Sequence, residues 1–184
     1  FLAANPEIAR SRHSGPVNFA DGSITGVELT LKSSLDQFLP QSLEGFGFSA
    51  SYTYADNGLE DENGNEITIP GYSDEVWSGD VYYENHGWQA RVSARHRSGF
   101  LSEVQNFDGT LSGAEAQGET IVDLQVGYEW DQGPLEGFGV NFEVFNLTDE
   151  PFVTENETAN PSVTFPSRHE LYGTTYNITI SKSF

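Results

Sequence analysis

The sequence contains no cysteine and no methionine among its 184 residues. Without cysteine the chain cannot form a disulfide framework, a thiolate metal site or a cysteine nucleophile. Basic residues are also scarce, because 8 Lys and Arg stand against 28 Asp and Glu, for a formal net charge of −20. Nucleic-acid surfaces need clustered basic residues, so we expect no nucleic-acid partner. No apolar run approaches the ~20 residues of a transmembrane helix, which excludes a helical membrane protein.

The start of the chain is unusual as well. It reads Phe1-Leu2-Ala3, with no methionine and no basic-then-apolar order of a signal peptide. We therefore expect a processed chain or a piece of a larger protein. Aromatic residues make up 13% of the chain, whereas disordered acidic chains are poor in them, so the composition argues against disorder.

Alternation of apolar and polar residues is the strongest pattern in the sequence. From Ile121 to Trp130, apolar residues such as Val122 and Leu124 alternate with Asp123 and other polar or small residues. Successive side chains of a strand point to opposite faces, so such a segment forms a strand with one apolar and one polar face. The same pattern recurs at 27–32, 46–54, 77–84, 87–97, 138–144 and 176–184. The sequence therefore predicts seven strands and no helix.

Short and long connections alternate between these strands. The short ones are 36–45, 84–87 and 131–137, and the long ones are 56–73, 99–118 and 148–171. This order is typical of an all-β, antiparallel up-and-down transmembrane β-barrel, which has short periplasmic turns and long outer loops. We predict that residues 1–22 form an extracellular loop and residues 23–184 form barrel strands joined by these outer loops.

A soluble β-sandwich or lipocalin-like barrel would also alternate, but it would hide its apolar face inside. Here the other face carries too many charges for a packed interior: Glu28, Lys32, Asp80, Glu84, Arg91, Arg95, Arg97, Asp123, Glu129 and Glu143. Aromatic residues also gather at two heights along the strands, as the two bilayer interfaces favour. We predict membrane-anchoring roles for Trp77, Trp88, Trp130 and Phe184.

The predicted strand number is odd, whereas bacterial single-chain barrels have an even number of strands. Unpaired strand edges in lipid leave backbone groups unsatisfied at several kcal/mol each. We therefore expect Phe1 to lie within an outer loop of a larger barrel and Phe184 to be its C-terminus. The alternative is a complete eight-stranded barrel whose first strand shows no clear pattern.

Several stretches, taken in order, resemble the C-terminal part of a TonB-dependent outer-membrane receptor. They are GSITGVEL at 22–29, LEGFGFSASYTY at 43–54, IPGYS at 69–73, FNLTDEPF at 145–152 and the closing segment 172–184. Two positions depart from the family pattern, since Thr174 stands where arginine is common and Lys182 where an aromatic residue is common. A lysine there can extend its ammonium group to the inner interface.

The resemblance implies a 22-stranded barrel with an N-terminal plug, of which this chain would form the last seven strands. It implies active uptake of a nutrient across the outer membrane of a Gram-negative bacterium, with an oligosaccharide favoured over an iron-siderophore. The expected partners are outer-membrane lipid, lipopolysaccharide, the nutrient, and the plug and TonB through a part of the protein outside this chain. A passive porin, a surface adhesin and an outer-membrane barrel enzyme are the alternatives, although no acid–His or Ser–His constellation supports an enzyme.

Two groups of residues are candidate sites. A network facing the lumen is predicted from the charged positions Asp80, Glu84, Arg91, Arg95, Arg97, Asp123 and Glu129. Such a network would hold the barrel or plug in place, or line a path for anions. Substrate contacts are predicted at Phe107, Asp108, Arg168 and His169, which lie in outer loops. The acidic stretch 56–66 lacks the spacing of an EF-hand loop, and the histidines are scattered, so we predict no metal site and no cofactor.

Overall fold

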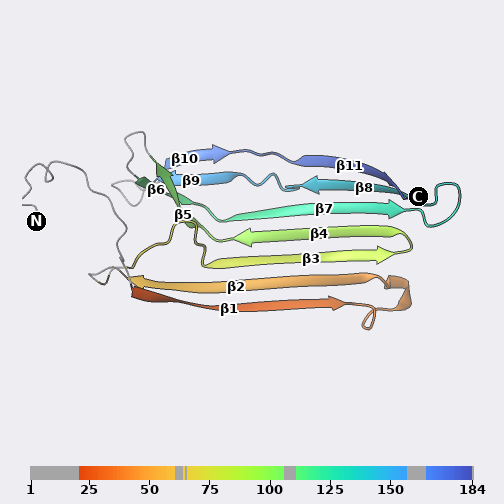
Figure 1. Cartoon of the computed structure of the whole chain (residues 1–184), viewed down its shortest axis with the longest axis horizontal. Coiled ribbons are helices and arrows are strands. Elements are labelled where there is room, and N and C mark those ends of the chain that lie inside the picture. Colours follow the sequence, from red (N-terminus) through yellow and green to blue (C-terminus); the bar gives the residue numbers. More distant parts are fainter. Residues whose placement is uncertain (1–20, 61–63, 65, 106–110, 157–164, 184) are drawn as a thin grey trace, which may run out of the picture.

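The structure is a computed structural model that describes residues 21–60, 64, 66–105, 111–156 and 165–183. Seven strands form one antiparallel sheet, here called the wall, in the order β1-β2-β3-β4-β7-β8-β11 (Figure 1). Their bounds are Asp21–Ser34, Phe46–Glu60, Glu75–Asn85, Trp88–Arg97, Glu119–Glu129, Phe138–Phe145 and Thr175–Lys182. The described residues contain no α-helix, and Gln41–Leu43 form a 3-10 turn. No helix among the described residues is long and apolar enough to cross a membrane.

The wall consists of the seven strands that the alternation predicts, which confirms an all-β antiparallel fold. Two boundaries differ from the prediction by several residues. β1 begins at Asp21, and β2 continues to Glu60, into the predicted connection 56–73. The ends of these strands pair with each other, from Asp21 opposite Glu60 to Thr25 opposite Asp56. Backbone pairing rather than side-chain alternation forms this part of the ladder, so the pattern could not reveal it.

The register gives the wall two different faces. Val92 lies opposite Val81 on β3 and opposite Leu124 on β7. The next residue, Ser93, lies opposite Asp80 on β3. Residues that face each other across a ladder point to the same side of the sheet, so apolar positions gather on one face and polar positions on the other.

The apolar face of the wall is exposed. Leu29 is 63% exposed, Trp88 52% and Ile180 71%, although all three are apolar side chains. Among the described residues, the buried hydrophobic side chains are Ala114, Ala116 and Val144, and of these only Val144 belongs to the wall. The wall therefore covers no interior, and its apolar face requires an apolar partner outside it.

Four further strands form a small sheet in the order β10-β9-β6-β5. Their bounds are β5 Phe100–Gln105, β6 Leu111–Ala116, β9 Phe152–Asn156 and β10 Phe165–Glu170. They come from the segments 99–118 and 148–171, for which the sequence analysis predicted loops without strands. β6 and β9 join the two hairpins through two residue pairs, and Ala114, Ala116 and Thr154 are buried there. These strands are short, and small residues pack between them, so no apolar alternation marked them.

The two ends of the wall differ. At one end, the turn end, short connections such as His86-Gly87 reverse the chain, with φ of 52° and 81° in these two residues. Positive φ at both positions suits the tight hairpin turns that match the strand twist. At the other end, the loop end, lies the small sheet (Figure 1). β1 and β11 are the two edges of the wall, which is an open sheet over the described residues.

Candidate functional site

The polar face of the wall carries ion pairs between neighbouring strands. Arg91 Nη1 on β4 lies 3.1 Å from Asp80 Oδ1 on β3, and its Nη2 lies 3.5 Å from Glu84 Oε1. Arg95 Nη1 lies 2.8 Å from Asp123 Oδ2 on β7. The structure thus brings together five residues of the predicted lumen network. Glu129 shares this face nearer the turn end, and none of the salt bridges found among the described residues involves it.

Arg97, the next arginine along β4, has a different set of partners. Its Nε donates to Ser73 Oγ at 3.1 Å, and its Nη2 donates to Gly71 O at 3.0 Å. Its guanidinium carbon lies 3.8 Å from the centroid of the Phe100 ring. Arg97 therefore holds the segment 69–74 at the loop end of the wall by hydrogen bonds. Arg91 and Arg95, in contrast, form ion pairs with carboxylates.

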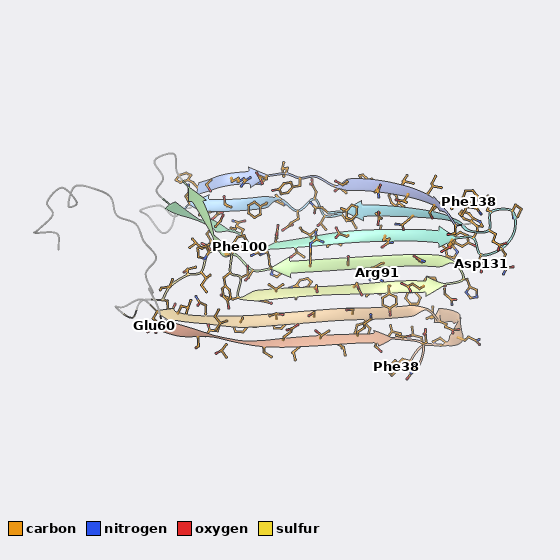
Figure 2. The ribbon with its side chains drawn as sticks, in the orientation of Figure 1. Phe38, Glu60, Arg91, Phe100, Asp131 and Phe138 are labelled. Carbon is orange, nitrogen blue, oxygen red and sulfur yellow. The ribbon has the colours of Figure 1, made fainter. Side chains whose placement is uncertain are left out.

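A cavity of about 490 Å³ lies at the loop end, beside the contacts of Arg97. Its lining comes from the end of β2, from the segment 66–74, and from residues of β5 and β6. Figure 2 shows Phe100, one of the lining residues, at the loop end, and Arg91 farther along the wall toward the turn end. The volume falls within the range of about 300–1,000 Å³ that is usual for small-molecule sites.

The lining of the cavity is acidic. Four carboxylates contribute to it, those of Asp56, Glu66, Asp74 and Glu115. Tyr72 also lines it, and its hydroxyl donates a hydrogen bond of 2.6 Å to Ala55 O. Burial raises the pKa of Tyr72 above its ordinary value, and the neighbouring Asp74 and Asp56 carboxylates raise this pKa further. The neutral phenol is therefore favoured at this position.

Two of the predicted substrate-binding residues, Arg168 and His169, are not among the described residues that line this cavity. Arg168 and His169 lie on β10, where Arg168 Nε donates to Glu170 Oε1 at 2.5 Å. Glu170 also accepts a hydrogen bond from the hydroxyl of Tyr172, and this bond, together with Arg168, lowers the pKa of Glu170. Arg168 is therefore paired with Glu170 on its own strand. Phe107 and Asp108 lie outside the described residues.

Three of the predicted anchoring aromatic residues, Trp77, Trp88 and Trp130, lie at the two ends of the apolar face. Trp77 stacks on His96 toward the loop end, with ring centroids 5.3 Å apart. At the turn end, Tyr128 contacts both Trp88 and Trp130, each with a centroid distance of 4.8 Å. Offset and edge-on contacts of this kind stabilise an aromatic cluster by about 0.5–1.5 kcal/mol per pair beyond burial. Phe184 lies outside the described residues.

No group of three or more metal-binding side chains comes together in the described part of the chain. Residues 61–63 and 65 of the acidic stretch lie outside it. His96 accepts or donates a hydrogen bond of 2.8 Å with Thr120 Oγ1 and is stacked by Trp77, so its place on the wall has a structural explanation. The loop-end cavity was not predicted from the sequence. The sequence features that belong to this cavity are the acidic stretch beginning at Asp56 and the Pro70-Gly71 turn before Tyr72. Only the fold brings these two segments together.

An antiparallel wall with one exposed apolar face and one charged face is consistent with a barrel-type fold. A family model described as TonB dependent receptor-like, beta-barrel matches residues 3–147. The chain therefore belongs to this family, which confirms the resemblance seen in the sequence. The family is one of outer-membrane transport receptors rather than enzymes, and it works in general with a plug and TonB. Searches of curated proteins and of solved structures gave no match.

Proposed function

We propose that this chain forms part of the wall of a closed outer-membrane barrel that takes up a nutrient actively. In this proposal the apolar face contacts lipid, and the polar face lines the lumen around a plug. The barrel has 22 strands, of which the wall supplies seven, so that strands outside this chain pair with the edges β1 and β11. The loop end faces outward, next to lipopolysaccharide, and the cell is a Gram-negative bacterium.

The exposed apolar face carries this proposal. The described wall has side chains such as Leu29 and Ile180 more than half exposed on one face, and the Arg91 and Arg95 ion pairs on the other. A soluble sheet would be stabilised by the opposite arrangement, since apolar burial contributes roughly 25 cal/mol per Å². A lipid exterior and an aqueous interior satisfy both faces at once. No catalytic step is part of the proposal.

The ligand class that we propose is an oligosaccharide rather than an iron-siderophore. The loop-end cavity supports this choice, because its carboxylates are hydrogen-bond acceptors that suit the hydroxyl donors of a sugar. Arg168 and His169 would then contact a ligand farther out, on the small sheet, as the sequence analysis predicted. The ion pairs of the polar face would support the barrel and its plug.

Uptake measurements test this function in whole cells that make the intact protein. Cells receive labelled oligosaccharides or a labelled ferric hydroxamate siderophore, with and without a protonophore that dissipates the inner-membrane proton gradient. We expect oligosaccharide uptake that depends on the protein and falls to background when the gradient is removed. Uptake that the protonophore leaves unchanged would indicate a passive porin, and protein-dependent uptake of the siderophore alone would replace the ligand class.

A further inference from the structure

The hairpin β9–β10, here called the outer hairpin, is joined to the wall by two short segments. The first stem, 146–151, follows β8, and the second stem, 171–174, leads into β11. The two stems meet at Asn146, whose Nδ2 donates to Gly173 O at 3.4 Å and whose carbonyl accepts from Thr174 Oγ1 at 2.9 Å. One residue of the first stem therefore holds the second stem in place.

The backbone of Asn146 lies in the left-handed region, with φ of 54°. Among residues other than glycine, asparagine and aspartate adopt this region most readily. The side chain also closes its own turn, because Oδ1 accepts from Glu150 N at 2.8 Å and Nδ2 donates to Glu150 O at 3.1 Å. The position therefore requires both a residue that tolerates positive φ and the acceptor and donor of a carboxamide.

The backbone N–H of Asn146 connects this turn to the polar face of the wall. It donates to Asp123 Oδ1 at 2.9 Å, while Asp123 Oδ2 accepts the 2.8 Å contact from Arg95 Nη1. The Asp123 side chain is only 18% exposed, so its carboxylate depends on these partners for compensation of its lost hydration. Without Arg95 the carboxylate would be less firmly oriented, and Asn146 N would lose a fixed acceptor.

We propose that Asn146 is a positioning residue that sets the place of the outer hairpin, and that Asp123 makes this place depend on the Arg95 ion pair. The inference rests on the proposed function, in which Arg168 and His169 of this hairpin contact the ligand. An anionic group in the lumen that draws Arg95 away from Asp123 would loosen the hairpin. The contiguous hydrogen-bond network thus connects the lumen with the outer ligand contacts.

Three replacements of Asn146 separate its side chain from its backbone conformation. Asn146→Gly keeps the positive φ without the carboxamide, Asn146→Asp keeps the φ and the acceptor for Glu150 N, and Asn146→Ala retains neither. Hydrogen exchange of the first stem is measured by mass spectrometry on the purified intact protein. We expect exchange on the order of 10-fold faster in Asn146→Gly, because each lost hydrogen bond contributes about 0.5–1.5 kcal/mol. Asn146→Asp should lie between Asn146→Gly and wild type, and Asn146→Ala should exchange fastest. Wild-type exchange in Asn146→Gly would overturn the role of the side chain.

Arg95→Ala tests the link to the lumen. Arg91→Ala is its matched control, because Arg91 lies on the same face of β4 and pairs with Asp80 and Glu84 instead of Asp123. We expect first-stem exchange to rise about 2–5-fold in Arg95→Ala, since an exposed ion pair contributes up to about 1 kcal/mol. It should stay at the wild-type rate in Arg91→Ala. No effect of Arg95→Ala, or an equal effect of both variants, would overturn the link through Asp123.

The place of the outer hairpin is measured as a distance between two nitroxide labels by pulsed electron paramagnetic resonance. The labels are attached to Phe165→Cys on β10 and Leu29→Cys on β1, both at exposed positions. We expect a narrow distance distribution that broadens in Asn146→Gly and narrows again in Asn146→Asp. A distribution that Asn146→Gly leaves unchanged would contradict a positioning role, even where exchange in the turn is faster.

Folding of each variant is checked by the shift in electrophoretic mobility between heated and unheated samples. These measurements need neither ligand nor energy source, so protonophore-resistant uptake would contradict active transport and leave them unaffected. In the uptake assay, Asn146→Gly should raise the oligosaccharide concentration for half-maximal uptake and leave the maximal rate unchanged, as loss of binding alone does. An unchanged half-maximal concentration, with energy-dependent uptake by the wild type, would contradict this inference alone.

Discussion

At the residue scale, similar side chains on one strand have different roles because their neighbours differ. Arg91 and Arg95 form ion pairs, and their side chains are 43% and 61% exposed. Pairs this exposed to water contribute only about 0–1 kcal/mol each, so stability alone does not explain three arginines on β4. Arg97 instead donates to the Gly71 carbonyl and the Ser73 hydroxyl and lies over the Phe100 ring. Its role is therefore to position the segment that contains Gly71 and Ser73.

Asp36 in the first turn offers a pH-dependent test at this scale. Its pKa lies below the ordinary value of 3.8, first because Gly45 N donates to Oδ1 at 2.7 Å and second because Ser34 Oγ donates to Oδ2. A lowered folded-state pKa means that the carboxylate contributes stability above the unfolded pKa and loses it as the pH falls through the folded pKa.

We therefore expect Asp36→Ala to lower the urea midpoint of the intact protein in lipid vesicles at pH 7. The difference between variant and wild type should shrink as the pH falls below 3.8 and through the lower folded-state pKa, at which the wild-type carboxylate becomes protonated. Tryptophan fluorescence during urea titration measures both midpoints. A difference that stays constant down to pH 2.5 would show that the Asp36 charge has no part in holding this turn.

At the scale of elements, the described parts of the connections at the loop end form short strands and hydrogen-bonded segments. The two hairpins β5–β6 and β9–β10 join through β6 and β9, and Thr154 Oγ1 lies 2.8 Å from Ser167 Oγ between β9 and β10. Small buried residues let these strands approach, whereas the segment 66–74 is held by the side chain of Arg97 from the wall and by its own Tyr72, whose hydroxyl donates to Ala55 O. The cavity lies where these two arrangements meet.

Replacing Arg97 by alanine should release the segment 66–74 and leave the wall folded. The change removes donors to Ser73 and Gly71, each worth about 0.5–1.5 kcal/mol. We expect hydrogen exchange of peptides covering 66–74 to become faster by on the order of 10-fold, since 1.4 kcal/mol corresponds to a factor of ten. Mass spectrometry measures this exchange.

Arg95→Ala is the matched control for this prediction, because Arg95 is an arginine on the same face of β4 that pairs with Asp123 instead. It should leave exchange in 66–74 at the wild-type rate. Arg97→Lys keeps the charge but lacks the forked donors, so we expect an intermediate rate. Wild-type exchange in Arg97→Ala would mean that the backbone contact between Gly71 and Leu101 holds the segment without help.

At the scale of the whole molecule, the two faces of the wall must meet different surroundings. The apolar face has aromatic residues at both heights and aliphatic residues such as Val92 between them. The polar face holds the ion pairs of β3, β4 and β7. We therefore expect the same substitution at two neighbouring positions on one strand to change the stability of the protein by different amounts.

Val92→Lys and Ser93→Lys compare the two faces at one height on β4. Val92 is 47% exposed on the apolar face, so lysine there should destabilise the protein by about 2–4 kcal/mol, as lysine does at the middle of the bilayer. Ser93 lies opposite Asp80 and Asp123, so lysine there should be close to neutral. Urea unfolding in lipid vesicles measures both, and equal costs at the two positions would argue against a lipid-facing surface.

By itself, the sequence determined the seven wall strands, their two faces and the family. Strand alternation is local, since each residue adds one side chain to one face, so Val92 and Ser93 could be assigned from their neighbours alone. Only the tertiary structure decided the rest. The small sheet, the fastening by Arg97 and the acidic cavity depend on which distant segments share a register, as where Asn57 meets Ile67 and Gly71 meets Leu101. Such contacts join residues whose positions along the chain carry no common pattern.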